Sequence, residues 1–275
     1  MKNLAKSFFI SVLPVLALVY FVKAILNFSV DFSFLGIILI SIPIILFFSL
    51  LFIKPVARTS KNLIVYTLPI ILGTAISFFS LDINIISSAL ILALGWFLYI
   101  TWYSKLENRE NSIIQVGKKL PLLTFENDKK EQIEISNIKS DFKILLFYRG
   151  NWCPLCMAQI KEIADAYKEL AQKNAEVFLI SSQPHEFTSS LAKKHKVPFH
   201  FLVDVNNKNA KILDLVHENG LPMGFQLLGY DSDVVLPTVI ITDKDNSVIF
   251  ADLTDNYRVR PEPATFLEII NKHSS

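Results

Sequence analysis

The two cysteines of this chain lie in one tetrad, and no other residues are better suited to do chemistry. Cys153 and Cys156 are separated only by Pro154 and Leu155. Because proline is favoured in the first turn of a helix, the tetrad is expected to begin one. Free backbone N–H groups and the helix dipole stabilise a thiolate at that position. The second thiol, one turn further on, can close a disulfide with the first, so the spacing predicts a dithiol that cycles with its disulfide.

Helix electrostatics predict that Cys153 is the nucleophile. It follows Trp152 and lies nearest the helix N-terminus, so it should be the more exposed thiol with the lower pKa. On this interpretation Cys153 attacks and Cys156 resolves. Two alternatives are an inert buried pair and a zinc site completed by His195 and His200. Since 38 residues separate Cys156 from His195, far more than in a zinc finger, no metal is expected.

The elements around the tetrad alternate between strand and helix patterns. Apolar runs predict strands over 143–148, 176–181, 199–203, 238–242 and 247–251, and amphipathic patterns predict helices over 154–172, 186–195, 208–216 and 261–271. Strands joined by crossover helices are typical of a sheet that is covered on both faces. We therefore expect an α/β domain over residues 120–275, preceded by a mixed-charge linker over 104–119.

The first 103 residues have a different composition. Hydrophobic residues make up 52% of the chain and its mean hydropathy is +0.41, yet only eight of its 52 charged residues fall in this part. Four apolar stretches are close to the ~20 residues that a helix needs to cross ~30 Å of hydrocarbon. They cover residues 8–26, 34–53, 63–80 and 84–103. The prediction is an N-terminal four-helix transmembrane bundle.

Basic residues predict that both termini are cytoplasmic, because cytoplasmic flanks carry an excess of Lys and Arg. Lys23 alone lies on one side of the spans. The other side has Lys2, Lys6, Lys54, Arg58, Lys61, Lys105, Arg109, Lys118 and Lys119. With no Cys or His, and with Asp31 and Asp82 as its only acidic residues, the bundle is expected to be an anchor, or otherwise to bind a lipid or small molecule. The net charge of +2 does not indicate nucleic-acid binding.

The tetrad and three further stretches resemble the thioredoxin-fold superfamily, and within it the peroxiredoxin-like AhpC/TSA (redoxin) family. The matching stretches are 146–156, 178–182, 236–243 and 255–263. They extend over nearly all of residues 120–272 and none of the bundle. The resemblance implies an α/β thioredoxin-like domain, in which a central mixed sheet has helices on both faces.

The resemblance also implies roles for single residues. Pro237 corresponds to the cis-proline beside the cysteine pair, with a trans proline at a strand start as the alternative. Peroxiredoxins align their peroxidatic cysteine with Cys156, whereas Cys153 replaces their Thr or Ser and Arg149 replaces a proline. Arg149 is expected either to lower a thiolate pKa or hold a peroxide oxygen, or to be an ordinary exposed charge.

Two arginines before the last predicted helix belong to the same resemblance. Arg258 and Arg260 lie in a segment that is similar to the one preceding the family's final helix. We expect both side chains to be solvated or salt-bridged, and a position facing the thiols is the second interpretation.

Together these patterns predict a membrane-anchored, thiol-dependent redox protein with its dithiol on the cytoplasmic face. It would reduce peroxides or protein disulfides, with Trp152, Pro154, Arg149 and Pro237 close to the substrate. Its partners would be the lipid bilayer and a thiol reductant, either a thioredoxin-like protein or a low-molecular-weight thiol, and no cofactor is expected. The alternatives are a membrane redox sensor or interaction protein without turnover, and an extracytoplasmic thiol-disulfide oxidoreductase.

Overall fold

The computed structural model describes residues 2–28, 34–106 and 109–274, which form two compact units. The first unit consists of Met1–Pro55, Thr59–Lys105 and Pro222–Gly224, and the second of Val56–Arg58, Leu106–Leu221 and Phe225–Ser275. Asp31, which was expected in a loop between spans, and residues 107 and 108 of the predicted linker lie outside the described residues.

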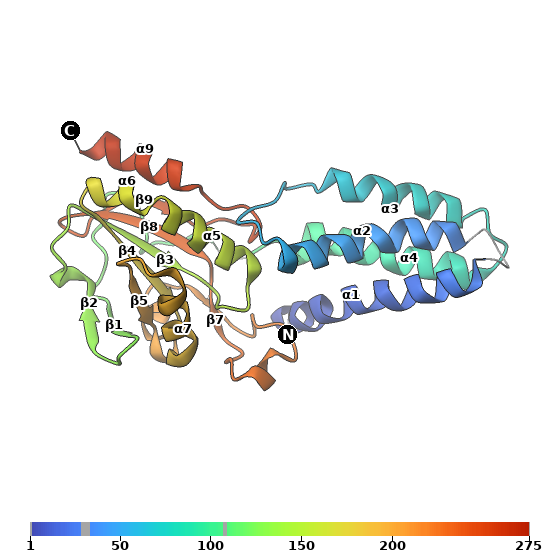
Figure 1. Cartoon of the computed structure of the whole chain (residues 1–275), viewed down its shortest axis with the longest axis horizontal. Helices are drawn as coiled ribbons and strands as arrows, with labels where there is room; N and C mark the ends of the chain where they lie inside the picture. Colours follow the sequence, from blue (N-terminus) through green and yellow to red (C-terminus); the bar gives the residue numbers. More distant parts are fainter. Residues whose placement is uncertain (1, 29–33, 107–108, 275) are drawn as a thin grey trace. The chain divides into compact units, whose positions relative to one another are not determined.

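The first unit is built from apolar helices (Figure 1). They are α1 (Lys2–Asn27), α2 (Phe34–Ile53), α3 (Ile64–Ser77) and α4 (Ile83–Leu98), which continues into a π-helical turn, Tyr99–Tyr103. Helix α2 contacts the other three. A Cβ atom on Gly73 would lie 2.6 Å from the carbonyl oxygen of Gly36, so these glycines allow the backbones of α2 and α3 to approach closely.

The structure supports three of the four predicted spans, and not clearly the fourth. Helices α1 and α2, and α4 with its π-helical turn, are long and apolar enough to cross a membrane, whereas α3 has 14 residues. At ~1.5 Å per residue, α3 extends about 21 Å, less than ~30 Å of hydrocarbon. The span predicted over 63–80 is longer than α3. The helix begins only after Leu63, which turns the chain with a φ of 48°, and it ends at Ser77.

The second unit contains a seven-stranded mixed sheet with the strand order β2-β1-β5-β4-β3-β8-β9. The strands are β1 (Thr124–Asn127), β2 (Gln132–Glu134), β3 (Phe142–Phe147), β4 (Ala175–Ser181), β5 (His200–Val203), β8 (Thr238–Asp243) and β9 (Val248–Asp252). Strand β4 is parallel to β3 and β5, and the other pairs are antiparallel. Ile144 of β3 is paired with Val177 on one side and Ile241 on the other, so apolar residues bury the centre of the sheet.

Helices cover both faces of this sheet, as Figure 1 shows: α5 and α9 on one face and α7 on the other. The helices are α5 (Pro154–Asp165), α6 (Tyr167–Gln172), α7 (His185–His195), α8 (Lys208–Ile212) and α9 (Pro263–His273). A separate pair of short strands, β6 (Val216–His217) and β7 (Val234–Val235), completes the unit. The predicted α/β thioredoxin-like fold is confirmed.

Several predicted boundaries in this unit were wrong. The helix predicted over 154–172 breaks at Ala166, where the backbone leaves the helical region. The helix predicted over 208–216 ends at Ile212, because Asp214 turns the chain with a φ of 53° and Val216 pairs in β6. Strand β2, at the edge of the sheet, and its neighbour β1 were not predicted, since each has too few residues to show a clear alternation.

The described residues of the predicted linker from Leu106 onward belong to the second unit. Ile114 is 2% exposed and lies in the same core cluster as Phe125 and Leu145. The backbone N–H of Leu106 donates to the carbonyl oxygen of Asp255 at 2.7 Å. The sequence did not predict this packing, because mixed charges surround the few apolar residues of 104–119. The second unit resumes at Leu106.

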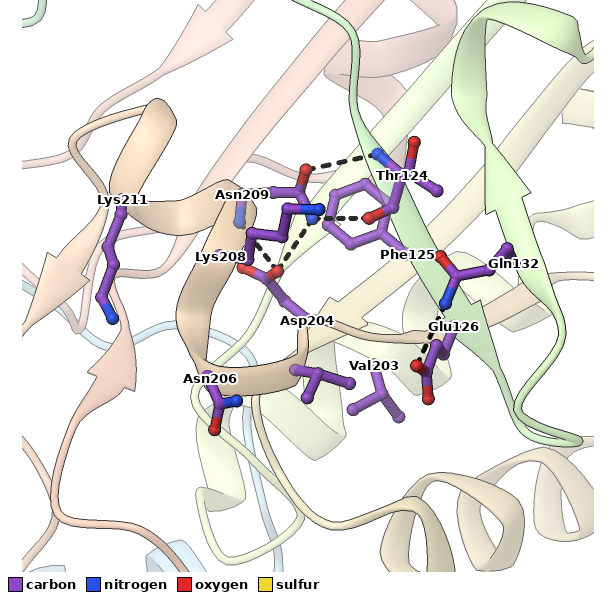
Figure 2. A pocket seen from close by; sticks show the side chains of 11 residues that line it. Thr124, Phe125, Glu126, Gln132, Val203, Asp204, Asn206, Lys208, Asn209 and Lys211 are labelled. Atoms are coloured by element: carbon purple, nitrogen blue, oxygen red, sulfur yellow. Dashed lines mark hydrogen bonds between the residues drawn. The ribbon is translucent and has the colours of Figure 1, made fainter.

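A buried carboxylate holds the turn that follows β5. Asp204 is 1% exposed and accepts hydrogen bonds from the backbone of Asn209 (2.9 Å) and Ala210 (2.7 Å), and from Asn209 Nδ2 (2.9 Å). The Asn209 amide also pairs with the backbone of Thr124, so the network ties α8 to β1 (Figure 2). These residues form part of the wall of a cavity of about 480 Å³, which shares no lining residue with the cysteine tetrad.

We expect Asp204→Ala to lower the free energy of unfolding by about 2–4 kcal/mol, because it leaves buried N–H donors without an acceptor. The midpoint of thermal unfolding of the purified full-length chain measures this. The matched control is Asp231→Ala, which removes an exposed carboxylate and should stay within about 0.5 kcal/mol of wild type. Equal midpoints for the two variants would show that the network adds no stability.

Candidate active site

The cysteine tetrad lies where the central strand ends and a helix begins. Strand β3 ends at Phe147, and α5 begins at Pro154 with Cys153 as its N-cap residue. Pro154 is therefore the first helical residue, as its type predicts. The backbone carbonyl of Cys153 accepts from the N–H of Met157 at 3.0 Å, which closes the first helical turn. The tetrad is thus held between the buried central strand β3 and the first turn of α5.

Both thiols are free and buried. Cys153 is 2% exposed and Cys156 is fully buried. Cys153 is thus only marginally the more exposed thiol, and neither thiol is open to solvent. Trp152, the residue before it, packs against the ring of Phe225, with the centroids 5.8 Å apart. The site excludes bulk water, and this strengthens every charge interaction within it.

Arg260 contacts the sulfur of Cys156. Its Nη1 lies 3.4 Å from Cys156 Sγ and donates to Gln159 Oε1 at 3.1 Å, while its Nε donates to the carbonyl oxygen of Tyr257. Both Arg258 and Arg260 are buried and therefore not solvated, and Arg260 faces a thiol, which was the second interpretation. Spacing did not reveal this contact, since 104 residues separate Arg260 from Cys156. The only signal was the resemblance of the segment around it.

The two thiols differ in acidity, and in the opposite sense to the one predicted. Burial opposes the Cys156 thiolate, but a hydrogen bond from Cys153, the charge of Arg260 and a backbone hydrogen bond from Arg149 together hold the pKa of Cys156 well below its ordinary value. Burial and the neighbouring Cys156 raise the pKa of Cys153. The hydrogen bond from Cys153 and the arginine contact therefore favour the Cys156 thiolate, whereas the helix N-terminus does not overcome the burial of Cys153.

Arg149 is part of this site and not an exposed charge. It is 5% exposed, and its guanidinium carbon lies 4.7 Å from the ring centroid of Trp152 and 6.0 Å from that of Tyr257. Its Nη2 donates to the carbonyl oxygen of Gly220. Its charge also favours the thiolate form of Cys153. The structure thus brings Arg149 and Trp152 together beside the thiols, as the sequence suggested.

Three buried N–H donors of these side chains have no acceptor among the described residues. They are Arg149 Nε, Trp152 Nε1 and Arg260 Nη2. A buried donor without a partner is costly, and such groups are usually satisfied by water or a ligand. These donors belong to side chains around the cysteine pair, and they suit a small substrate that offers oxygen lone pairs.

A polar network that the sequence did not reveal holds the loop before α5. Gln183 Nε2 donates to the Tyr148 hydroxyl at 3.0 Å, to Asn151 Oδ1 at 3.1 Å and to Thr188 Oγ1 at 3.2 Å. Its Oε1 accepts from the backbone of Asn151 at 2.8 Å. Gly150 adopts a φ of 144°, and a Cβ there would lie 2.7 Å from Trp152 Nε1. Only glycine fits this loop without strain.

Pro237 was predicted to be a cis-proline, and this was wrong. No peptide bond between described residues is cis. Pro237 directly precedes β8, where a trans proline is tolerated because no ladder donor is required. Its carbonyl oxygen accepts from Arg109 Nη2 at 3.1 Å. Among the described residues, no three His, Cys, Asp or Glu side chains group closely enough to hold a metal ion.

Comparisons with known proteins agree on one family. The model of the AhpC/TSA family matches residues 116–251. Peroxiredoxin Bcp of Bacillus subtilis (strain 168) is 28% identical over 102 residues, which cover 37% of this chain and 65% of that protein. The chloroplastic peroxiredoxin Q of Sedum lineare is 31% identical over 106 residues, which cover 38% and 57%.

This chain therefore spans less than two thirds of the length of these two relatives. A solved structure of the peroxidoxin BcpB from Mycobacterium tuberculosis is 18% identical and has a TM-score of 0.47, and the match covers 58% of this chain and 97% of that one. The family match lies outside the apolar helices and includes both cysteines. The second unit of this chain is therefore similar to the AhpC/TSA family over residues 116–251.

Proposed function

We propose that this chain is a membrane-anchored, thiol-dependent peroxidase in which Cys156 is the attacking thiolate and Cys153 resolves. The contact of Arg260 Nη1 with Cys156 Sγ carries the proposal, because it favours the thiolate, which is the nucleophilic form. This assignment reverses the expectation from helix electrostatics and agrees with the alignment to peroxiredoxins.

In the first step the Cys156 thiolate attacks the terminal oxygen of a hydroperoxide. The S–O bond forms as the O–O bond breaks, which leaves a sulfenic acid on Cys156 and releases an alcohol, or water from hydrogen peroxide, after protonation of the leaving oxygen. Negative charge develops on that oxygen. The unpartnered donors Arg149 Nε, Trp152 Nε1 and Arg260 Nη2 are suited to stabilise it.

In the second step Cys153 attacks the sulfenic sulfur, the disulfide forms and water leaves. The raised pKa of Cys153 fits this role, because a protonated thiol donates a hydrogen bond to the Cys156 thiolate until the sulfenic acid appears. An external thiol reductant, either a thioredoxin-like protein or a low-molecular-weight thiol, then supplies two electrons and two protons to restore the dithiol. Reduction of protein disulfides is a second candidate function, favoured by the free Cys-x-x-Cys dithiol itself.

The apolar helices of the first unit support the membrane anchor. Three of them have the length and composition of membrane spans, and the unit has no thiol or imidazole that could relay electrons. If α3 also crosses, so that the spans number four as the sequence predicts, the excess of Lys and Arg on one side favours a cytoplasmic location for both termini and for the dithiol.

Substitution of each cysteine tests the order of attack. With Cys153→Ser, peroxide should still oxidise Cys156, and a dimedone adduct of its sulfenic acid should accumulate because the resolving thiol is gone. With Cys156→Ser, peroxide consumption should be lost. Mass spectrometry of the full-length chain identifies the modified residue. Sulfenic acid on Cys153 of the Cys156→Ser variant, formed as fast as wild type reacts, would reverse the roles.

Removal of the guanidinium tests the origin of the low pKa. In the Cys153→Ser background, Arg260→Met should move the pH midpoint of Cys156 alkylation upward, toward the ordinary value of about 8.5, because the charge and the hydrogen bond of Arg260 no longer offset burial. Below both midpoints, the alkylation rate should fall about tenfold for each pH unit of that shift. Lys272→Met removes an exposed cation in α9 and is the control. An unchanged midpoint in Arg260→Met would refute this origin.

A reporter fusion tests the topology. Alkaline phosphatase fused after Ser275 should be inactive and green fluorescent protein at the same position should fluoresce, because the basic flanks retain the C-terminus in the cytoplasm. A phosphatase fusion that is active in intact cells would place the dithiol outside the cytoplasm and favour an extracytoplasmic oxidoreductase.

A further inference from the structure

The arginine that contacts Cys156 is itself held by a residue from far away in the sequence. Arg58 Nε donates to the backbone carbonyl of Arg260 at 3.1 Å, across 202 residues. The short segment Val56–Arg58, in the connection between α2 and α3, belongs to the second compact unit. Ala57, in its centre, is 1% exposed. This segment is therefore built into the unit that holds the thiols.

The guanidinium of Arg58 also joins two carboxylates on the segments that form the site. It makes a two-pronged ion pair with Glu162, which lies on α5 six residues after Cys156. It lies 3.3 Å from Glu262, the N-cap residue of α9 and the second residue after Arg260. One side chain thus bridges the helix that carries the thiol and the segment that carries its cation.

We propose that Arg58 is a positioning residue that holds Arg260 against the sulfur of Cys156 and thereby keeps this thiol reactive. The inference rests on the proposed role of Cys156 as the attacking thiolate. Charge stabilisation falls with distance, so a small withdrawal of Arg260 weakens its effect on the sulfur. Arg58 also neutralises Glu162 and Glu262, whose negative charges would otherwise disfavour a thiolate nearby.

This role is separable from fold stability. The side chains of Arg58, Glu162 and Glu262 are 27%, 38% and 59% exposed, and ion pairs this exposed contribute little to folding. A planar guanidinium is required to bind a carbonyl and two carboxylates at once, and a lysine ammonium cannot reproduce that geometry. We therefore expect substitutions of Arg58 to change the reactivity of Cys156 while the chain remains folded.

The test measures alkylation of Cys156 against pH in the purified full-length chain, with mass spectrometry to assign the site and no peroxide present. Arg58→Ala should move the midpoint upward by about 0.5–1 pH unit, which slows alkylation about three- to tenfold below both midpoints. Arg58→Lys should shift it less, because the charge is kept. Lys54→Ala, which removes an exposed cation from the same connection, should match wild type.

A combined variant separates charge from geometry. In Arg58→Ala, the further changes Glu162→Gln and Glu262→Gln should recover only part of the shift, because the hydrogen bond to Arg260 remains absent. Thermal unfolding midpoints verify that each variant is folded. An alkylation midpoint in Arg58→Ala equal to wild type, or an equal shift in Lys54→Ala, overturns the inference. A different result separates the two proposals. If Arg58→Ala raises the low alkylation midpoint of wild type, but wild type does not consume peroxide, the proposed function fails and the positioning role stands.

Discussion

The contact between Arg260 and the sulfur of Cys156 is the interaction on which the chemistry of this chain depends. Burial of a thiol raises its pKa, and a helix N-terminus alone does not compensate for full burial. At Cys156 a hydrogen bond from Cys153 and a guanidinium at 3.4 Å lower the pKa against burial, whereas at Cys153 the arginine charges do not offset burial and the neighbouring Cys156. The site thus uses burial and charge together: burial strengthens the attraction of the cation and removes competing water, and the cation makes the buried thiolate stable.

Two layers of structure hold this contact. The inner layer is local, since Tyr257 and Gln159 accept from Arg260 and fix its guanidinium. The outer layer connects distant parts of the chain, with Arg58 on the main chain of Arg260 and the Gln183 network on the loop before α5. Active sites that act through preorganised charges need this second layer, because displacement of a donor by a fraction of an ångström costs reactivity.

The first unit differs from the second in composition and packing. Its helices are packed through apolar residues and close glycine contacts, and its sequence contains no group that exchanges electrons with a thiol. All the candidate chemical groups lie in the second unit. This separation explains why the family match covers residues 116–251 only. The apolar helices and the cysteine pair therefore lie in different parts of one chain.

The sequence by itself determined the parts that depend on local pattern. Alternating strand and helix patterns specified the α/β fold, Pro154 marked the start of α5, and the tetrad identified the reactive thiols. The tertiary structure alone decided which thiol has the lower pKa. Arg260 lies 104 residues after Cys156, and Arg58 lies 104 residues before Glu162, so neither contact follows from local sequence. It also decided the length of α3 and the packing of Ile114. Periodicity reports which face of an element is apolar, whereas the pKa of a thiol depends on the few charges that the fold places within a few ångströms of it.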